Sequence, residues 1–283
     1  MKQFKKVCIV GVGLIGGSLA LALKKAGIAR TIVGVGHRNL SLKKAIELGA
    51  IDKGFLEFRK GISRADLVVL ATPVATILKY LERDFSSLEE GALITDTGST
   101  KKEIVKRAEL SLPPSLCFVG GHPIAGSEKR GVEAAAANLF KEKIVVLART
   151  SRTKQRALQM IKELWESVGA KPEILSPEQH DRIVAYFSHL PHLTAVALVK
   201  TVKESLRGGN LSFAGSGFKD TTRIAAGAPH LWRDIFSANA DEILSALLNF
   251  KKSLNAIEKL IKRKDWEELK NQLQGVKHFR EQI

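Results

Sequence analysis

The chain has 283 residues, of which 45% are hydrophobic and 26% are charged. These proportions are ordinary for a globular protein with a sizeable core, and the length suggests two domains. No apolar run approaches the ~20 residues that a bilayer-spanning helix needs, and the first six residues lack the apolar stretch of a secretory signal. Cys8 and Cys117 both lie inside apolar runs. We therefore expect no integral membrane protein, no disulfide scaffold and a cytoplasmic location.

The net charge of +16 indicates an anionic partner. A positive field of this kind speeds the capture of anionic small molecules. The basic residues are scattered in ones and twos, without an arginine-rich or aromatic-interleaved block, so we do not expect nucleic-acid binding. A solvated lysine surface is the other interpretation of the charge.

Residues 1–173 alternate short apolar runs with longer helical patterns. This alternation predicts an α/β domain with a parallel, doubly wound sheet. The predicted strands are Lys6–Val10, Thr31–Val35, Leu67–Ala71, Ala92–Thr95, Cys117–Gly120, Ile144–Leu147 and, at the edge, Lys171–Leu175. The predicted helices are Ser18–Ala26, Leu42–Leu48, Lys101–Leu110 and Thr153–Val168.

Residues 174–283 form the second predicted domain, which is helical. Ser176 resembles a helix N-cap, with Pro177 in the first turn and Gln179 at the capping-box position. Apolar residues recur at three- and four-residue spacings over 234–262 and describe one long apolar face. We expect this face to be buried against a second copy of the chain in a homodimer.

A glycine-rich turn follows the first strand directly. Gly11, Gly13 and Gly16 are spaced as G-x-G-x-x-G, with Leu14 and Ile15 between the last two, and a helix follows. In such turns the glycines allow a tight bend, close approach of a pyrophosphate and close packing of the helix on the strand. The strand before the turn and the helix after it favour dinucleotide binding.

The end of the second strand indicates which dinucleotide is bound. An acid there would bind the ribose 2′-hydroxyl of NAD, but the strand runs into Gly36, His37 and Arg38. Arg38 could pair with a 2′-phosphate, so NADP is favoured and NAD is possible. An exposed loop is the other interpretation of His37 and Arg38. Thr72 and Pro73, after the strand Leu67–Ala71, complete the predicted cofactor site.

Two further turns place polar side chains at carboxyl ends of strands, where open α/β sheets bind their ligands. Ser99 lies in the turn after the strand Ala92–Thr95, and His122 follows the strand Cys117–Gly120 between glycine and proline. Such a histidine is placed to contact a substrate rather than to fill a core.

Six motifs now identify a family. In chain order they are GVGLIGGSLALAL, ITDTGSTK, GGHPIAGSEKRGV, SHLPH, GFKDTTRIA and LWRDIF. Together they resemble the prephenate and arogenate dehydrogenases of tyrosine biosynthesis over about residues 6 to 260. In that family a nicotinamide-binding Rossmann domain precedes a helical dimerisation domain, and the active site lies in the cleft between them.

The resemblance implies oxidative decarboxylation of prephenate or arogenate, with hydride transfer to the nicotinamide. By similarity His122 accepts the proton of the substrate hydroxyl, to which Ser99 hydrogen-bonds, and a neutral imidazole suits that task near pH 7. Arg223 resembles the arginine that binds a substrate carboxylate. Glu128 and Asp181 resemble an ionic network that orients this arginine, although interdomain ion pairs are the alternative.

His189 and His192 are three residues apart, on one face if the segment is helical. Three interpretations are open: by similarity His192 lies near the substrate side chain, His189 is a structural histidine, or the pair binds a metal. A metal site would need a third ligand such as His180 or Asp181, and we predict none. Trp232 could wall the pocket or belong to the core.

Two other classes of protein are alternatives. One is another Rossmann-plus-helical enzyme, such as an imino-acid reductase or 3-hydroxyacid dehydrogenase, but the turns with Ser99 and His122 argue against it. The other is a non-catalytic dinucleotide sensor or a basic binding protein, and the presence of the glycines, His122 and Arg223 together argues against it.

Overall fold

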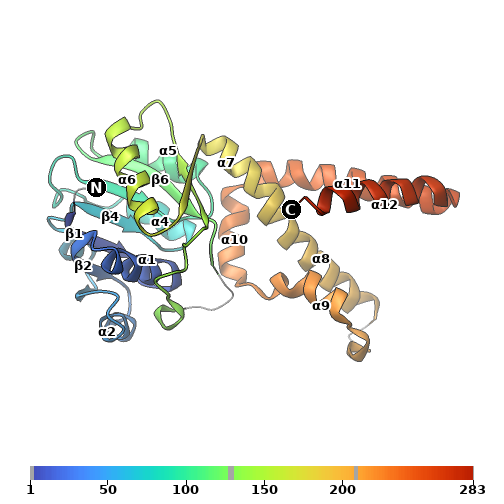
Figure 1. Ribbon diagram of the computed structural model, residues 1–283, viewed down its shortest axis with the longest axis horizontal. Helices are drawn as coiled ribbons and strands as arrows, with labels where there is room; N and C mark the ends of the chain where they lie inside the picture. The colour runs from blue at the N-terminus through green and yellow to red at the C-terminus, as the bar shows by residue number, and fades with distance from the viewer. Residues whose placement is uncertain (1–2, 127–130, 207–209, 283) are drawn as a thin grey trace.

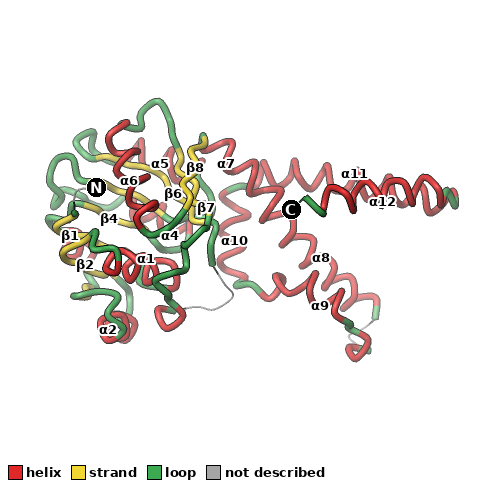
Figure 2. The backbone as a smooth tube through the Cα atoms, viewed as in Figure 1, coloured by secondary structure: helices red, strands yellow, loops and turns green. Residues whose placement is uncertain are grey.

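The computed structural model describes residues 3–126, 131–206 and 210–282. The N-terminal part is a sheet covered by helices, and a helical part projects from one side of it (Figure 1). The strands lie in the N-terminal part, whereas the described chain after residue 175 is helices and loops (Figure 2).

The eight strands form one sheet in the order β3-β2-β1-β4-β5-β6-β7-β8. They are β1 (Phe4–Val10), β2 (Ala29–Val35), β3 (Lys53–Phe55), β4 (Leu67–Leu70), β5 (Leu93–Asp96), β6 (Cys117–Pro123), β7 (Ile144–Ala148) and β8 (Lys171–Leu175). The order reverses at β1 and β4, which is the switch point where doubly wound sheets bind ligands. The predicted Rossmann-type fold is therefore confirmed.

Two details of the sheet differ from the prediction. β7 runs antiparallel to β6, with Pro123 opposite Val145. A parallel connection needs a crossover, usually a helix. Among the described residues between β6 and β7 the only helical turn is η1 (Val132–Ala134), so the chain returns from the end of the sheet that β6 reaches. The second difference is β3, which was not predicted because its three residues are too few to show an apolar period.

Helices cover both faces of the sheet. Those of the N-terminal part are α1 (Leu14–Lys25), α2 (Asn39–Glu47), α3 (Phe58–Ile62), α4 (Val74–Leu81), α5 (Lys102–Ser111) and α6 (Gln155–Ser167). Successive strand side chains point to opposite faces, so Val7 and Ile9 pack with α1 and α6, whereas Cys8 packs with α3, α4 and α5. The strands are buried on both sides and therefore read as continuous apolar runs.

The helical part begins with the predicted cap. The side chain of Ser176 accepts a hydrogen bond from the Gln179 backbone, and the Gln179 side chain accepts one from the Ser176 backbone. The elements that follow are α7 (Pro177–Val184), the π-turn η2 (Ala185–His189), α8 (Leu190–Ser205), η3 (Leu211–Phe213), α9 (Ser216–Thr222), η4 (Arg223–Ala226), α10 (Pro229–Ala238), α11 (Ala240–Arg263) and α12 (Trp266–Arg280). α11 and α12 form the arm that points away from the sheet (Figure 1).

The helical run Pro177–Ser205 is 29 residues long and apolar enough to cross a membrane by length and composition. This finding corrects the expectation that no segment approaches that length. The core helix of a soluble protein passes the same test, and this run buries His180, Asp181, His189 and His192 against the rest of the chain. Length and composition are therefore weak grounds for a membrane span here.

The long apolar face predicted over 234–262 is divided between α10 and α11. The break falls at Asn239, whose side-chain amide donates a hydrogen bond to the backbone oxygen of Asp181, 2.8 Å away. Beyond the break, Leu248, Leu254 and Ile261 are 56%, 48% and 50% exposed in the single chain.

Candidate active site

The glycine turn has the geometry that dinucleotide binding requires. Gly11 has a φ of +96°, a conformation that favours glycine, and a Cβ there would lie 2.5 Å from the Ala71 oxygen. A Cβ on Gly16 would lie 2.2 Å from the Gly11 oxygen, so only glycine lets α1 approach β1 this closely. The space around Gly13 is open, and no side chain caps α1. These features fit a pyrophosphate held by the helix N-terminus.

A cavity of about 700 Å³ lies between the glycine turn and the helical part. Nine predicted site residues line it, from both parts of the chain: Gly13, Leu14, Ile15, Thr72, Pro73, Ser99, His122, Arg223 and Trp232. Gly11 and Gly16 shape the turn beneath it. The tertiary structure thus brings the predicted cofactor turn, the two polar turns and the predicted carboxylate-binding arginine to one place.

His122 lies in β6 and is partly buried beside this cavity. Its Nδ1 is 2.7 Å from Nε2 of His180 in α7. Burial lowers the pKa of His122 well below the ordinary 6.5, and the nearby His180 and Lys101 lower it further. The imidazole is therefore neutral at pH 7 and can accept a proton.

Asp181, which is almost fully buried, binds the N-terminus of α5. One carboxylate oxygen accepts a hydrogen bond from the Lys101 backbone at 2.7 Å, and the other accepts one from Lys102 at 2.9 Å. The first oxygen also lies 2.7 Å from Nδ1 of His180. These contacts tie the helical part to the sheet, and the role expected for Asp181 in orienting Arg223 stays a prediction.

A buried ion pair supports both polar turns. The ammonium of Lys101 contacts the carboxylate of Asp96 and donates to the Gly121 oxygen at 2.8 Å. Asp96 also accepts hydrogen bonds from the backbone of Gly98 and Gly121. Burial lowers the pKa of Lys101, and Asp96 opposes that shift. The pair joins the turn of Ser99 to the strand of His122.

The aromatic wall contains Trp232 and His192. Their rings stack with centroids 3.5 Å apart and an interplanar angle of 9°. Trp232 lines the cavity, whereas His192, 3% exposed, is not among the lining residues and lies behind it. Gly227 allows this packing, because a Cβ there would lie 2.5 Å from the Trp232 indole nitrogen.

His189 is fully buried and lies 3.2 Å from the side-chain amide of Asn239. Burial lowers its pKa to about 4. The described ranges contain no group of three or more metal-binding side chains.

Three predicted residues lie outside this assembly. His37 and Arg38 follow β2, are exposed and do not line the cavity. Glu128 lies outside the described residues.

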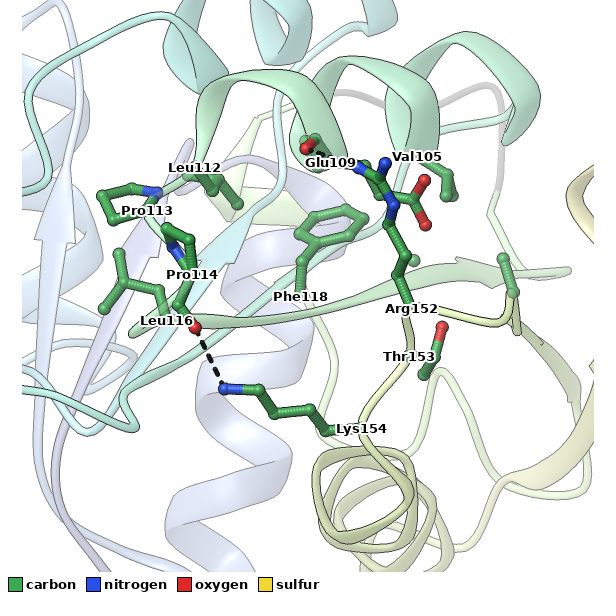
Figure 3. A pocket seen from close by; sticks show the side chains of 13 residues that line it. Val105, Glu109, Leu112, Pro113, Pro114, Leu116, Phe118, Arg152, Thr153 and Lys154 are labelled. Carbon is green, nitrogen blue, oxygen red and sulfur yellow. Dashed lines mark hydrogen bonds between the residues drawn. The ribbon is translucent and has the colours of Figure 1, made fainter.

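A second cavity of about 400 Å³ lies between α5, β6 and the segment before α6. Phe118 points into it, and the Lys154 ammonium binds the Pro114 oxygen at its edge (Figure 3). It contains none of the predicted site residues.

Four residues that support the site were not predicted from the sequence in these roles: Asp96, Lys101, His180 and Asn239. The aspartate that ends a buried strand, with a lysine five residues later, was the available signal for the ion pair. His180 was considered only as a metal ligand, and nothing local indicated Asn239.

Two family profiles match the chain: the nucleotide-binding domain of prephenate dehydrogenase over residues 19–174, and its dimerization domain over residues 176–275. Prephenate dehydrogenase of Bacillus subtilis is 38% identical, over 99% of this chain and 77% of that protein. Cyclohexadienyl dehydrogenase of Zymomonas mobilis is 32% identical, over 99% and 94%. The crystal structure of prephenate dehydrogenase from A. aeolicus with hydroxyphenyl propionate and NAD+ has a TM-score of 0.92 and 40% identity, covering 99% of this chain and 98% of that one.

Proposed function

The chain belongs to the prephenate dehydrogenase family, and on that premise we propose that it oxidatively decarboxylates prephenate or arogenate. The products are 4-hydroxyphenylpyruvate or tyrosine, and NAD(P)+ is reduced. The observation that carries the proposal is the cavity in which the neutral imidazole of His122 lies with the glycine turn and Arg223.

The glycine turn would hold the dinucleotide, and the nicotinamide would supply the hydride acceptor. His122 takes the proton of the ring hydroxyl as the carbon–hydrogen bond breaks, and Ser99 hydrogen-bonds the same oxygen. The electron pair of the bond to the departing carbon dioxide enters the ring, which becomes aromatic. Arg223 binds the substrate side-chain carboxylate, since a guanidinium presents two parallel donors and keeps its charge. Trp232 walls the pocket, and His192 supports it from behind.

The histidine assignment predicts a separation of chemistry from binding. We expect His122→Asn to lower kcat by about 10²- to 10⁴-fold, the usual contribution of a general base, because asparagine cannot take up the proton. Cofactor affinity should stay nearly unchanged, since the glycine turn is intact. Initial rates and a fluorescence titration with reduced cofactor measure the two effects. His278→Asn, on the exposed end of α12, is the control, and wild-type turnover in His122→Asn would contradict the assignment.

We propose NADP as the preferred cofactor, with NAD as the alternative. Arg38 is exposed at the end of β2, where a 2′-phosphate would need a cation, and His37 beside it is exposed as well. The related A. aeolicus structure contains NAD+, which is the reason to keep NAD as the alternative.

Prephenate is proposed over arogenate because, by similarity, His192 matches the family position near the substrate side chain, although here it lies behind Trp232 and would act through that ring. A matrix of catalytic efficiencies, with both substrates and both cofactors, tests these choices together through the absorbance of reduced nicotinamide. Absence of a signal in all four pairings would overturn the proposed function.

We also propose that residues 1–173 and 174–283 are the two domains and that the helical domain forms a cytoplasmic homodimer. The dimerization profile and the exposed apolar residues of α11 support the dimer. The two free thiols, Cys8 and Cys117, suit a reducing compartment.

Substitutions on α11 test the proposed homodimer. Leu254→Asp should weaken the dimer, because it places a charge on the exposed apolar face. Asn255→Asp adds the same charge at an exposed polar position and should leave the dimer intact. Sedimentation velocity over a range of concentrations measures the difference, and equal behaviour of the two variants would count against this interface.

A further inference from the structure

His180 lies directly behind His122, at the junction of the sheet and the helical part. It is fully buried, and its ring meets that of His122 edge to face, with centroids 5.0 Å apart. Both of its nitrogens are engaged: Nε2 lies 2.7 Å from Nδ1 of His122, and Nδ1 lies 2.7 Å from a carboxylate oxygen of Asp181. The three side chains form a continuous chain of hydrogen bonds.

The Asp181 carboxylate determines which atoms donate and which accept in these hydrogen bonds. An ionised carboxylate only accepts hydrogen bonds, so Nδ1 of His180 must donate to Asp181. A neutral imidazole carries one proton, which leaves Nε2 of His180 as an acceptor. Nδ1 of His122 must then carry the proton and donate it to His180.

We propose that His180 is a positioning residue that holds His122 in the tautomer with Nε2 unprotonated. Nε2 is then the basic nitrogen available to the substrate hydroxyl in the cavity that His122 lines. The proposal rests on the proposed function for its kinetic consequence, but the tautomer itself belongs to the free protein.

The opposite tautomer leaves unfavourable contacts. With its proton on Nε2, His122 would point a lone pair at the lone pair of His180 across 2.7 Å. Reversing His180 as well would turn its Nδ1 lone pair onto the carboxylate of Asp181. Since His180 and Asp181 are buried, water cannot relieve either contact, and one arrangement satisfies all three groups.

Backbone groups hold Asp181, the last residue of this series of hydrogen bonds, in place. Asp181 is held by the backbone N–H groups of Lys101 and Lys102, and its own backbone oxygen is held by Asn239. The helical part therefore orients His122 of the sheet, through His180, which lies 58 residues later in the sequence.

Burial is the main reason that both imidazoles are neutral at pH 7, and the surrounding charges modify its effect. Burial lowers the pKa of His180, although the hydrogen bond to Asp181 opposes this shift. Lys101 lowers the pKa of both histidines, His189 lowers that of His122, and Asp96 raises that of His180. When His122 takes up the substrate proton, its Nδ1–H becomes a stronger donor to His180, which is in turn bonded to a carboxylate.

The tautomer is measurable without substrate by ¹⁵N–¹H correlation spectra of the full protein labelled at histidine, because protonated and bare ring nitrogens differ widely in ¹⁵N shift. The His122 signals are assigned by their loss in His122→Asn. We expect Nδ1 protonated and Nε2 bare in the wild-type protein. In His180→Leu, where the acceptor is lost, we expect Nε2 to become protonated in a substantial fraction of molecules.

Kinetics give the second readout. His180→Leu should lower kcat on the order of 10²-fold with little change in KM, because general-base catalysis is impaired while binding groups remain. His180→Gln keeps an oxygen that can accept from Nδ1 of His122 and should recover part of the rate. His278→Leu, the matched substitution on exposed α12, should leave both spectrum and rate unchanged.

A wild-type spectrum with the proton on Nε2 of His122 would overturn the proposal, whether or not the variants fold. An unchanged tautomer and kcat in folded His180→Leu would also overturn it. Absence of turnover in the wild-type protein with the expected tautomer would instead overturn the proposed function alone.

Discussion

Lys101 shows how one buried side chain supports the two polar turns of the site. Its ammonium and the carboxylate of Asp96 are both fully buried, and together they bind backbone groups of Gly98 and Gly121. Burying two charges is costly, and their mutual attraction and hydrogen bonds offset that cost only while both partners are present. We infer that the pair holds Ser99 and His122 at a constant separation.

Replacing Lys101 by Met should therefore destabilise the protein strongly. The substitution leaves the Asp96 carboxylate buried without its cation, a change that typically costs about 3–5 kcal/mol in the free energy of unfolding. Lys102→Met is the matched control, because the Lys102 side chain is exposed and its backbone contact with Asp181 is retained. Urea denaturation measures both variants. A loss below about 1 kcal/mol in Lys101→Met would show that the pair does not support the turns.

At the scale of elements, the approach of α1 to β1 depends on the absence of a side chain at Gly16. A methyl group there would meet the Gly11 oxygen at 2.2 Å and the Ile9 side chain at 2.8 Å. The Gly11 oxygen is part of the backbone of the turn, and the Ile9 side chain is buried in β1, so α1 itself would have to move. The helix N-terminus would then leave the position in which its N–H groups face the cavity.

Gly16→Ala should accordingly weaken cofactor binding by about tenfold or more, since about 1.4 kcal/mol of lost phosphate contact corresponds to a factor of ten. Gly275→Ala is the control within a helix: its Cβ meets nothing within 4 Å in α12. That control should keep wild-type affinity and raise the stability by about 0.5–1 kcal/mol. Calorimetric titration with the dinucleotide gives the affinities, and an unchanged affinity in Gly16→Ala would argue against this account of the turn.

At the scale of the whole molecule, three neutral histidines lie at the junction between sheet and helices, with His180 and His189 fully buried and His122 partly buried. Burial lowers the pKa of His122, of His180 and of His189, the last to about 4. In the unfolded chain each would titrate near its ordinary value of 6.5. Below that pH the histidines of the unfolded chain bind protons, whereas those of the folded chain do not, so acid favours unfolding.

The free energy of unfolding should therefore fall as the pH is lowered from 7 toward 5. Each histidine contributes a slope of up to about 1.4 kcal/mol per pH unit, beginning near the unfolded value and ending at its folded pKa. Urea denaturation at several pH values measures the slope, and His189→Gln should reduce it by removing one titrating group. Stability that is constant over this range would contradict the burial of neutral histidines at the junction.

Much of the fold was predictable from the sequence. The central strands read as apolar runs, the glycine turn follows a strand and precedes a helix, and the start of α7 carries its own cap. Each of these signals lies within a few residues of chain, because strand burial, turn geometry and capping are set by local neighbours. The six motifs likewise indicated the family before the cavity was known.

Other features depend on contacts between distant residues, and only the tertiary structure decided them. No periodic pattern in the sequence indicates these features. They are the antiparallel β7, the break at Asn239, the burial of Lys101 and the contact of His180 with His122. His122 and His180 are 58 residues apart, and Lys101 and Asp181 are 80 apart. Their chemistry exists because the helical part packs on the carboxyl ends of the strands and buries Lys101, His180 and Asp181 away from water.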